Sequence, residues 1–434
     1  MRRLHPAKIL VLGYLFYSLI GFLLLSLPIC HKESVPLIDS YFTAVSSIST
    51  TGLATIDIGS EYNFFGQLII LLLIQLGGIG YMTFSSFVVL CTSQKLSSYR
   101  QKIGKSSFPV PQHFSIQEFI ISVVVFSFLA ELIGAIALSL VFWYKNIDYW
   151  LWQGIFHSIS AFCTAGLSLF SDGFVPFQKN GACNVIISTL AILGSLGFIV
   201  SLDFYKKWTK RGHFLSFTTK VILIMSVSFL TLGTILFFIL ESLSDHATTF
   251  DKFLIGFFQV TSATTTTGFN TIDIGTLTPP MIILLGFLST FGASPSGTGG
   301  GVKNTSFAAL FGFVKNTLKD HPTTFWRHLI PVNRVKIATV SFIFYVFTLS
   351  LSLFVLSLSE HRHQTTISLF FEAANALNNS GLSMGVTSDL TDLGKIFIAL
   401  LMLMGRVGVL TFGVAISSQT EEKIFTYKKT ELIT

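Results

Sequence analysis

Long uncharged stretches alternate with polar ones along the whole chain of 434 residues. A membrane-spanning helix needs about 20 consecutive apolar residues to cross about 30 Å of hydrocarbon. Six stretches meet this length without any charged residue, and two more are interrupted by a single charge, Glu131 or Arg406. The pattern therefore predicts eight membrane spans, at residues 9–31, 62–94, 119–144, 180–202, 221–240, 274–302, 337–359 and 396–420.

Four further uncharged stretches lie between these spans, and they are rich in Ser, Thr, Asn and Gly. A helix this polar is unsuited to lipid, so we expect each stretch to dip into the membrane while it is shielded by protein or lines water. The order of span, polar stretch and span then occurs four times along the chain. The polar stretches are residues 40–56, 149–171, 253–272 and 373–388.

The polar stretches share a register, which indicates an internal repeat. Each has a glycine with a phenylalanine ten residues before it and an aspartate five to eight residues after it, and successive glycines are 114, 102 and 113 residues apart. The second span of each unit carries its own motif, LGGIG, LGSLG, FGASP or MGRVG. We predict an all-α polytopic membrane protein of four helix–pore-loop–helix repeats in a pseudo-fourfold arrangement around one axis. The expected repeats are residues 1–107, 108–212, 213–325 and 326–434.

Uncharged residues precede each shared glycine, and this combination suits the binding of a monovalent cation. Glycine permits backbone torsions that turn carbonyl oxygens toward an axis, and four such loops would replace the hydration shell of the ion. The C-terminal end of a short preceding helix also favours a cation. One Thr-Gly pair indicates only a helix C-cap, whereas four in one register favour a selectivity filter. Its predicted residues are Thr50, Thr51, Gly52, Thr164, Ala165, Gly166, Thr266, Thr267, Gly268, Asn379, Ser380 and Gly381.

The span at 274–302 contains residues that oppose a continuous helix. Five glycines and Pro295 lie within residues 292–301, and each glycine costs about 1 kcal/mol and a proline about 3 kcal/mol in a helix. We expect two half-helices around a mobile middle that borders a water-filled path; a glycine-rich packing face is the alternative. The predicted gate comprises Gly292, Gly297, Thr298, Gly299, Gly300 and Gly301, followed by Lys303, which either faces a cytosolic vestibule or snorkels to the membrane interface.

Arg406 and Glu131 are charged residues inside predicted spans, where a charge costs several kcal/mol and is usually functional or paired. Arg406 occupies the position of Gly78, Ser195 and Ala293 in the other repeats. On a pore-facing helix it would repel cations and form the second part of the gate. An ion pair with Glu131 is the structural alternative.

Composition and charge narrow the class of protein. Charged residues make up 11% of the chain and hydrophobic residues 51%, whereas soluble domains are about a quarter charged. The four cysteines have no metal-type spacing, no phosphate-binding loop is present, and we expect neither enzymatic activity nor a bound cofactor. Twenty Lys and Arg residues lie in the terminal segments and the even-numbered connections, against six on the other side, which places both termini in the cytoplasm. The net charge of +7 thus reflects topology and not nucleic-acid binding.

These motifs resemble the Trk/Ktr superfamily of potassium transporters. The four glycine loops match its filter, FGASPSGTGGGVKNTS at 291–306 matches its intramembrane loop, and GRVGVLTFG at 405–413 matches its arginine-bearing last helix. Eight spans favour the Ktr type. The resemblance implies potassium uptake across the cell (inner) membrane, with K⁺ as substrate held by backbone carbonyls, a homodimer, and a separate cytosolic ring of nucleotide-binding regulatory subunits. The basic inner loops would contact that ring or anionic membrane lipid.

Departures from the family pattern leave a related function open. The second loop contains Cys163 and Ala165, and the fourth contains Asn378, Asn379 and Ser380, so one ring of the filter is chemically uneven. A sodium- or ammonium-conducting relative of the same architecture is therefore the first alternative. An intramembrane enzyme would need a cluster of titratable side chains at membrane depth, and a scaffold would not need four matched polar loops.

Overall fold

The computed structural model describes residues 5–93, 116–209, 214–241, 248–326, 328–360 and 364–417, and these ranges are mostly helical. Many basic residues behind the topology prediction lie outside the described residues, among them Arg2, Lys95, Arg211 and Lys423. The predicted repeat boundaries after residues 107 and 212 lie outside them as well. The boundary after residue 325 falls inside a short β-hairpin.

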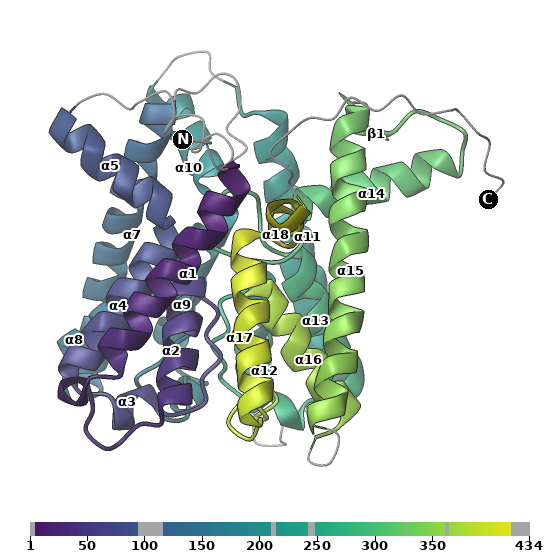
Figure 1. Ribbon diagram of the computed structural model, residues 1–434. Coiled ribbons are helices and arrows are strands. Elements are labelled where there is room, and N and C mark those ends of the chain that lie inside the picture. Colours follow the sequence, from purple (N-terminus) through teal and green to yellow (C-terminus); the bar gives the residue numbers. More distant parts are fainter. Residues whose placement is uncertain are drawn as a thin grey trace.

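The order of a long first helix, a short helix and a second helix in two pieces occurs four times (Figure 1). The first helices are α1 (Pro6–Leu25), α7 (Ile116–Tyr144), α11 (Phe217–Leu240) and α15 (Val332–Glu360). The short helices are α2 (Leu37–Ser49), α8 (Trp150–Phe162), α12 (Thr249–Thr265) and α16 (Thr366–Asn378). The second helices are α4 (Phe64–Ile79) with α5 (Tyr81–Ser93), α9 (Gly181–Leu196) with α10 (Phe198–Thr209), α13 (Pro279–Phe291) with α14 (Asn304–Thr317), and α17 (Asp392–Val407) with α18 (Val409–Ser417).

The remaining elements are short connections between these helices. The antiparallel strands β1 (Thr324–Phe325) and β2 (His328–Leu329) join α14 to α15. Single turns follow the first helix or the loops, namely η1 (Pro28–Cys30), α3 (Ile58–Glu61), η2 (Val175–Phe177) and η3 (Ile274–Thr276). Asp57 and Asp273 accept hydrogen bonds of 2.8 Å from Gly59 and Gly275 and so cap α3 and η3. Asp57 and Asp273 therefore have a structural role in these turns.

The long first helices are suited to a membrane by both length and surface. Among the described residues, four helices are long and apolar enough to span it, and counting each of two bent pairs as one span gives six. α4 and α13 are also apolar but shorter, with 16 and 13 residues. Large apolar side chains stay exposed on the first helices, including Phe16 and Leu19 on α1 and Leu132 and Ile133 on α7. Such faces are typical of contact with lipid. The chain is a multi-pass membrane protein, and the count of eight spans stays a prediction.

Three second helices bend where the sequence suggested continuous spans. α4 ends at Gly80, α9 at Gly197 and α17 at Gly408, with φ values of 85°, 89° and 90°. The two pieces meet at 90° around Gly197 and at 96° around Gly408. Only glycine adopts this torsion without strain, so each helix turns at that residue. The predicted break of the third second helix is confirmed, because residues 292–303 separate α13 from α14.

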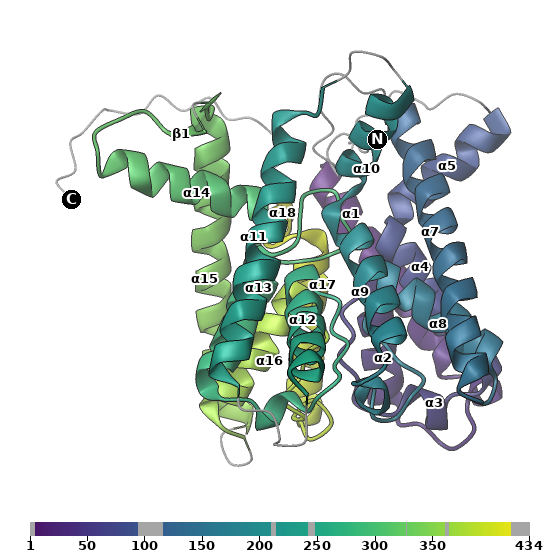
Figure 2. The same ribbon diagram turned by 180° about the vertical axis from the view of Figure 1, so that it is seen from behind.

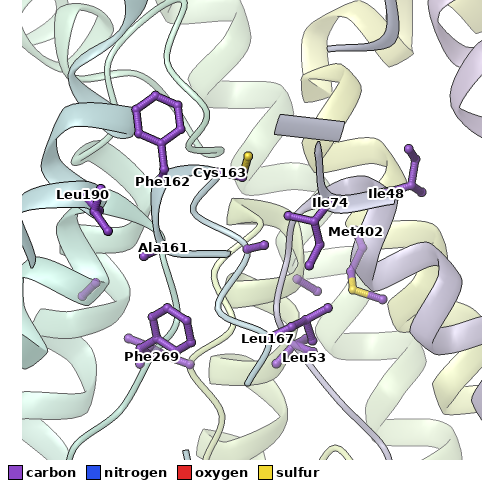
Figure 3. Packing of buried hydrophobic residues seen from close by; sticks show 14 of the residues in the cluster. Ile48, Leu53, Ile74, Ala161, Phe162, Cys163, Leu167, Leu190, Phe269 and Met402 are labelled. Carbon is purple, nitrogen blue, oxygen red and sulfur yellow. The ribbon is translucent and has the colours of Figure 1, made fainter. Parts of the chain in front are cut away.

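The short helices occupy the interior of the molecule. They lie in the lower half of Figure 1, and the reverse view in Figure 2 shows them among the first and second helices. The phenylalanine ten residues before each shared glycine anchors its short helix, since Phe42, Phe156, Phe258 and Phe371 are each at most 2% exposed. Figure 3 shows Leu53, Leu167 and Phe269, which directly follow three of the glycines, in the same buried apolar cluster. The loops after the short helices are thus held in one packed core.

Candidate functional site

Each short helix ends in the same backbone turn. The residue two positions before the shared glycine is left-handed in all four units, with φ of 51° at Thr50, 52° at Thr164, 57° at Thr266 and 49° at Asn379. The next N–H donates back to the helix, over 2.9, 2.8, 2.9 and 2.8 Å in the four units. This is the C-cap geometry that reverses a chain at a helix end. The four predicted filter loops (residues 50–52, 164–166, 266–268 and 379–381) therefore share one conformation at their start.

The carbonyl oxygens of the filter loops are free of protein donors. Within the described ranges, no N–H or O–H donates to the backbone carbonyl of any of these twelve residues. Thr50, Thr164, Thr266 and Asn379 are nonetheless at most 1% exposed. Nine of the twelve residues are buried, while Gly52, Gly166 and Gly381 are partly exposed. Buried backbone carbonyls are usually paired with protein or water, so a group of carbonyls without a protein donor is a candidate site for a ligand.

The four loops touch one another in a closed order. A Cβ placed on Gly52 would lie 2.4 Å from the Ala165 carbonyl oxygen, and one on Gly166 would lie 2.2 Å from that of Thr267. A Cβ on Gly268 would lie 2.3 Å from Gly381 N, and one on Gly381 would lie 2.8 Å from Gly52 Cα. Each loop thus abuts the next, and the fourth abuts the first. No larger residue fits at these contacts, which bring together all four predicted loops.

The residue before each loop secures it in one of two ways. In the first and third units a hydroxyl pair within the loop does so, Ser49 with Thr51 and Thr265 with Thr267, both at 2.7 Å. In the fourth unit, Asn378 reaches out of the loop to Tyr345 (2.9 Å) on α15, and also to α13.

In the second unit the residue before the loop is Cys163, and its thiol lies next to Glu131. Cys163 Sγ lies 3.6 Å from Glu131 Oε1 on α7 and 3.8 Å from Gln75 Oε1 on α4. The Gln75 amide donates to both Glu131 oxygens, at 3.1 and 2.8 Å. Glu131 thus binds a neutral amide and a thiol behind the second loop. The alternative of an ion pair between Glu131 and Arg406 is wrong, because their hydrogen-bond partners are different.

Close packing explains why each second helix carries a glycine motif, which the sequence alone did not reveal. A Cβ on the second residue of each motif would overlap a carbonyl oxygen of a short helix: 2.2 Å from Ile48 O for Gly77, 1.9 Å from Phe162 O for Gly194, 2.1 Å from Thr264 O for Gly292 and 2.3 Å from Leu377 O for Gly405. The second helices therefore press directly on the C-terminal turns of the short helices. The only sign of this contact in the sequence is that the glycine recurs at the same position of all four motifs.

Gly194→Ala tests this packing through stability. The added methyl would meet the backbone oxygen of Phe162 at 1.9 Å, and overpacking of this kind costs about 1–3 kcal/mol or more. We expect a clearly lower melting temperature in detergent than for Gly181→Ala. Gly181 lies on the same helix, and a methyl group added there would have nothing within 4 Å. Equal melting temperatures for the two variants would therefore contradict the contact.

The gate loop (residues 292–301) lies directly against the ends of the short helices. Thr298 contacts the second unit, with its hydroxyl 3.2 Å from Phe162 O and 3.1 Å from Thr164 Oγ1. Gly300 N donates to Thr266 Oγ1 in the third unit at 3.0 Å, and a Cβ on Gly300 would lie 2.0 Å from Asn378 O in the fourth. The predicted gate residues therefore lie next to the predicted filter residues.

Two cations flank the gate loop. Arg406 donates to Thr50 Oγ1 at 2.8 Å, to Gly78 O at 3.2 Å, and to the carbonyl oxygens of Thr298 and Gly77. Lys303 Nζ donates to Gly299 O at 2.6 Å and to Gly300 O at 3.0 Å. These partners are all neutral oxygens, so the contacts leave the two positive charges uncompensated.

A cavity of about 180 Å³ borders the gate loop. Its lining includes Tyr14 of α1, the breaks at Gly80 and Gly408, and both Lys303 and Arg406. Lys303 lines this cavity, which we refer to as the vestibule. That the vestibule opens to the cytosol, as one of the two alternatives for Lys303 requires, stays a prediction. The described residues that line the vestibule include Gly297, Gly299, Gly300 and Gly301 of the gate loop but none of the twelve filter-loop residues.

Comparisons with known proteins find similar proteins along almost the whole chain. A family model described as TrkH, cation transport protein, matches residues 8–427. Ktr system potassium uptake protein B of Vibrio alginolyticus is 31% identical over 98% of this chain and 94% of its own length. The protein of the same name from Bacillus subtilis is 31% identical over 100% of this chain and 97% of its own. Potassium/sodium uptake protein NtpJ of Enterococcus hirae is 31% identical over 100% and 98%.

One solved structure shows that the fold is shared. The crystal structure of the potassium transporter TrkH from Vibrio parahaemolyticus matches with a TM-score of 0.74 and 21% identity, over 95% of this chain and 84% of that chain. Fold and comparisons together define a membrane transporter for cations and not an enzyme. The chain belongs to the TrkH family of cation transport proteins, which confirms the resemblance seen in its motifs.

Proposed function

We propose that the chain takes up potassium ions through the four filter loops, arranged with pseudo-fourfold symmetry around one pathway. The observation that carries this proposal is the group of twelve filter-loop carbonyls without a protein donor among the described residues, on loops that abut in a closed order. Carbonyl oxygens are the ligands that replace the hydration shell of K⁺ in a filter. The C-terminal ends of the four short helices add a favourable dipole for a cation.

Uptake by purified protein in proteoliposomes tests this function. We expect ⁸⁶Rb⁺ to accumulate and unlabelled K⁺ to compete at lower concentration than Na⁺, because the carbonyl cage replaces the weakly held hydration shell of the larger ion. Equal competition by K⁺ and Na⁺ would favour the second candidate, a sodium-conducting relative. That candidate has one specific support, the name potassium/sodium uptake protein of the Enterococcus hirae relative. Competition by ammonium in the same assay tests the corresponding alternative of an ammonium-conducting relative.

The gate in this proposal consists of residues 292–301 together with Lys303 and Arg406. The loop contacts the second, third and fourth short helices, and Arg406 contacts the first unit through Thr50. A cation leaving the filter would meet this closed loop and two positive charges before it reached the vestibule. The arrangement supports a closed state that opens when the loop moves aside.

Deleting residues 297–301 tests the gate. We expect faster ⁸⁶Rb⁺ uptake than in the intact protein, because the segment that separates filter from vestibule is lost. The deletion must elute as the same species as the intact protein in size-exclusion chromatography. Slower or unchanged uptake by such a folded variant would favour a packing role for the glycines.

We further propose a location and partners for the chain. Both termini face the cytoplasm of a cell (inner) membrane, as the distribution of Lys and Arg predicts. The chain forms a homodimer, contacts membrane lipid and is regulated by a cytosolic nucleotide-binding ring. The relatives named as protein B of a Ktr system support a multi-component assembly, since that name implies other components. Co-purification of the cytosolic nucleotide-binding protein with a tagged form of this chain tests the proposed partner.

A further inference from the structure

A second polar position, behind the filter loops, recurs in all four units. It directly follows the anchoring phenylalanine of each short helix and is occupied by Thr43, His157, Gln259 and Glu372. All four side chains are at most 2% exposed. Burying a polar side chain is costly unless it is hydrogen-bonded, so a buried polar residue at the same register in every unit indicates a shared task.

In the second and third units this side chain holds the chain that returns from the loop. His157 Nδ1 donates to Gln153 O at 2.8 Å, which leaves Nε2 to accept from Ser168 Oγ at 3.0 Å and from Leu169 N at 3.3 Å. The Gln259 amide lies 3.1 Å from Thr271 Oγ1. With its oxygen toward the loop it accepts from Thr271 N at 2.6 Å and Ile272 N at 3.2 Å. Both residues thus fix a segment two to four positions after the shared glycine.

The fourth unit does the same with a carboxylate. Glu372 Oε1 accepts from the hydroxyl of Ser383, two positions after Gly381, and from Thr387 Oγ1 at 3.0 Å. The two hydroxyls are 3.0 Å apart, and Ser383 Oγ also accepts from Gly385 N at 3.0 Å. In the first unit, within the described residues, no hydrogen bond joins Thr43 to Thr55, although both hydroxyls are buried. The side chain of Thr43 is the shortest of the four.

The fourth loop depends most on this support. Its glycine, Gly381, does not have the positive φ of Gly52, Gly166 and Gly268. The fourth loop also lacks the hydroxyl pair that secures the first and third loops. Its returning segment is tied instead to a carboxylate that accepts from two hydroxyls at once. Both hydrogen bonds go to one oxygen, Oε1, which a glutamine side chain would also offer. An ionised carboxylate is, however, a stronger acceptor than a neutral amide, so Glu372 holds the two hydroxyls more firmly than a glutamine would.

We propose that Glu372 is a positioning residue that sets the ion preference of the filter by fixing residues 382–387 through Ser383 and Thr387. The proposal rests on the filter function proposed above. Glu372 acts behind the loop and does not touch the ion. His157 and Gln259 do the equivalent work in the second and third units.

Glu372→Gln tests this role, with Glu360→Gln as its matched control. Glu360 is also fully buried and also accepts from a hydroxyl, Thr391 Oγ1 at 2.5 Å, but that threonine caps α17 and not a filter loop. We expect Glu372→Gln to lower the preference for K⁺ over Na⁺ in ⁸⁶Rb⁺ competition about fivefold, the equivalent of about 1 kcal/mol. We expect Glu360→Gln to change the melting temperature and leave the preference unchanged.

A double substitution in the fourth loop removes the donors of the same hydrogen bonds. Ser383→Ala with Thr387→Val removes both donors to Glu372, so it is expected to lower the preference as Glu372→Gln does, and combining the three changes should add little. This variant serves the test on its own if Glu372→Gln does not fold. Unchanged preference in a transporting variant, or an equal loss in Glu360→Gln, would overturn the proposal. Failure of the filter function itself would look different, because the unaltered protein would then show no preference for K⁺.

Discussion

Gly268→Ser is expected to remove most of the preference of the transporter for K⁺ over Na⁺. Gly268 has φ of 89°, and its Cβ would lie 2.3 Å from Gly381 N and 2.4 Å from Gly381 Cα. A serine there is strained in its own backbone and pushes the third loop away from the fourth. We expect the ratio of apparent KM values for Na⁺ and K⁺ to fall about tenfold or more, the equivalent of about 1.4 kcal/mol.

A glycine in the same unit provides the control for this variant. Gly286 on α13 has nothing within 4 Å of the Cβ position, so Gly286→Ala should keep both the fold and the ion preference. Competition of K⁺ and Na⁺ against ⁸⁶Rb⁺ uptake measures both variants. A transporting Gly268→Ser protein with the original ratio would show that the loops abut without selecting ions.

Arg406→Gln is expected to raise the uptake rate by about tenfold or more. Two unit charges about 5 Å apart repel by about 3 kcal/mol at an effective dielectric constant of about 20, and each 1.36 kcal/mol of barrier is a factor of about ten in rate. The guanidinium touches Thr50 of the first loop and Thr298 of the gate loop. Its removal therefore lowers the barrier and also loosens the loop that closes the path.

Arg406→Lys separates these two effects. Lysine keeps the positive charge but cannot reproduce the forked donors that reach Thr50, Thr298 and Gly77 together. If the charge sets the barrier, Arg406→Lys stays slow; if the hydrogen bonds hold the gate shut, it is as fast as Arg406→Gln. Uptake rate and melting temperature are measured for both. Slower uptake with a large fall in melting temperature for Arg406→Gln would show a purely structural arginine.

The order of the helices and the turns that end the short helices could be predicted because their information is local. The signal for each short helix lies within eleven residues, from a phenylalanine to the glycine ten positions later, with small polar residues between them. A helix that ends in this way needs a left-handed C-cap, and the structure has one in each unit, at Thr50, Thr164, Thr266 and Asn379. The break of the third second helix was also local, since five glycines and Pro295 oppose a helix on their own.

The break at Gly197 depends on a contact that the sequence does not show locally. Gly197 lies in an uncharged apolar run that favours one continuous helix, yet its Cβ would lie 2.6 Å from the carbonyl oxygen of Pro295, about a hundred residues away. The gate loop thus requires glycine at a place where local propensity gives only a small penalty. Helix breaks imposed by a distant loop are visible only once the loop is placed.

The two charged residues within apolar spans illustrate the same limit. Glu131 and Arg406 invited pairing with each other because both interrupt apolar spans. Glu131 instead binds Gln75 of the preceding unit, and Arg406 binds neutral oxygens of the first and third units. Apart from the Cys163 thiol beside Glu131, the partners belong to repeats other than the one that carries the charge, so no spacing along the chain could identify them.

The location of bound Rb⁺ tests the central claim most directly. A crystal of the protein grown in rubidium salt gives an anomalous signal for that ion, and a crystal grown in sodium salt serves as the blank. We predict a peak enclosed by the filter loops, with the backbone carbonyl oxygens of Thr51, Ala165, Thr267 and Ser380 around it. A well-ordered set of loops with Rb⁺ bound elsewhere, or with no peak between them, would contradict the account.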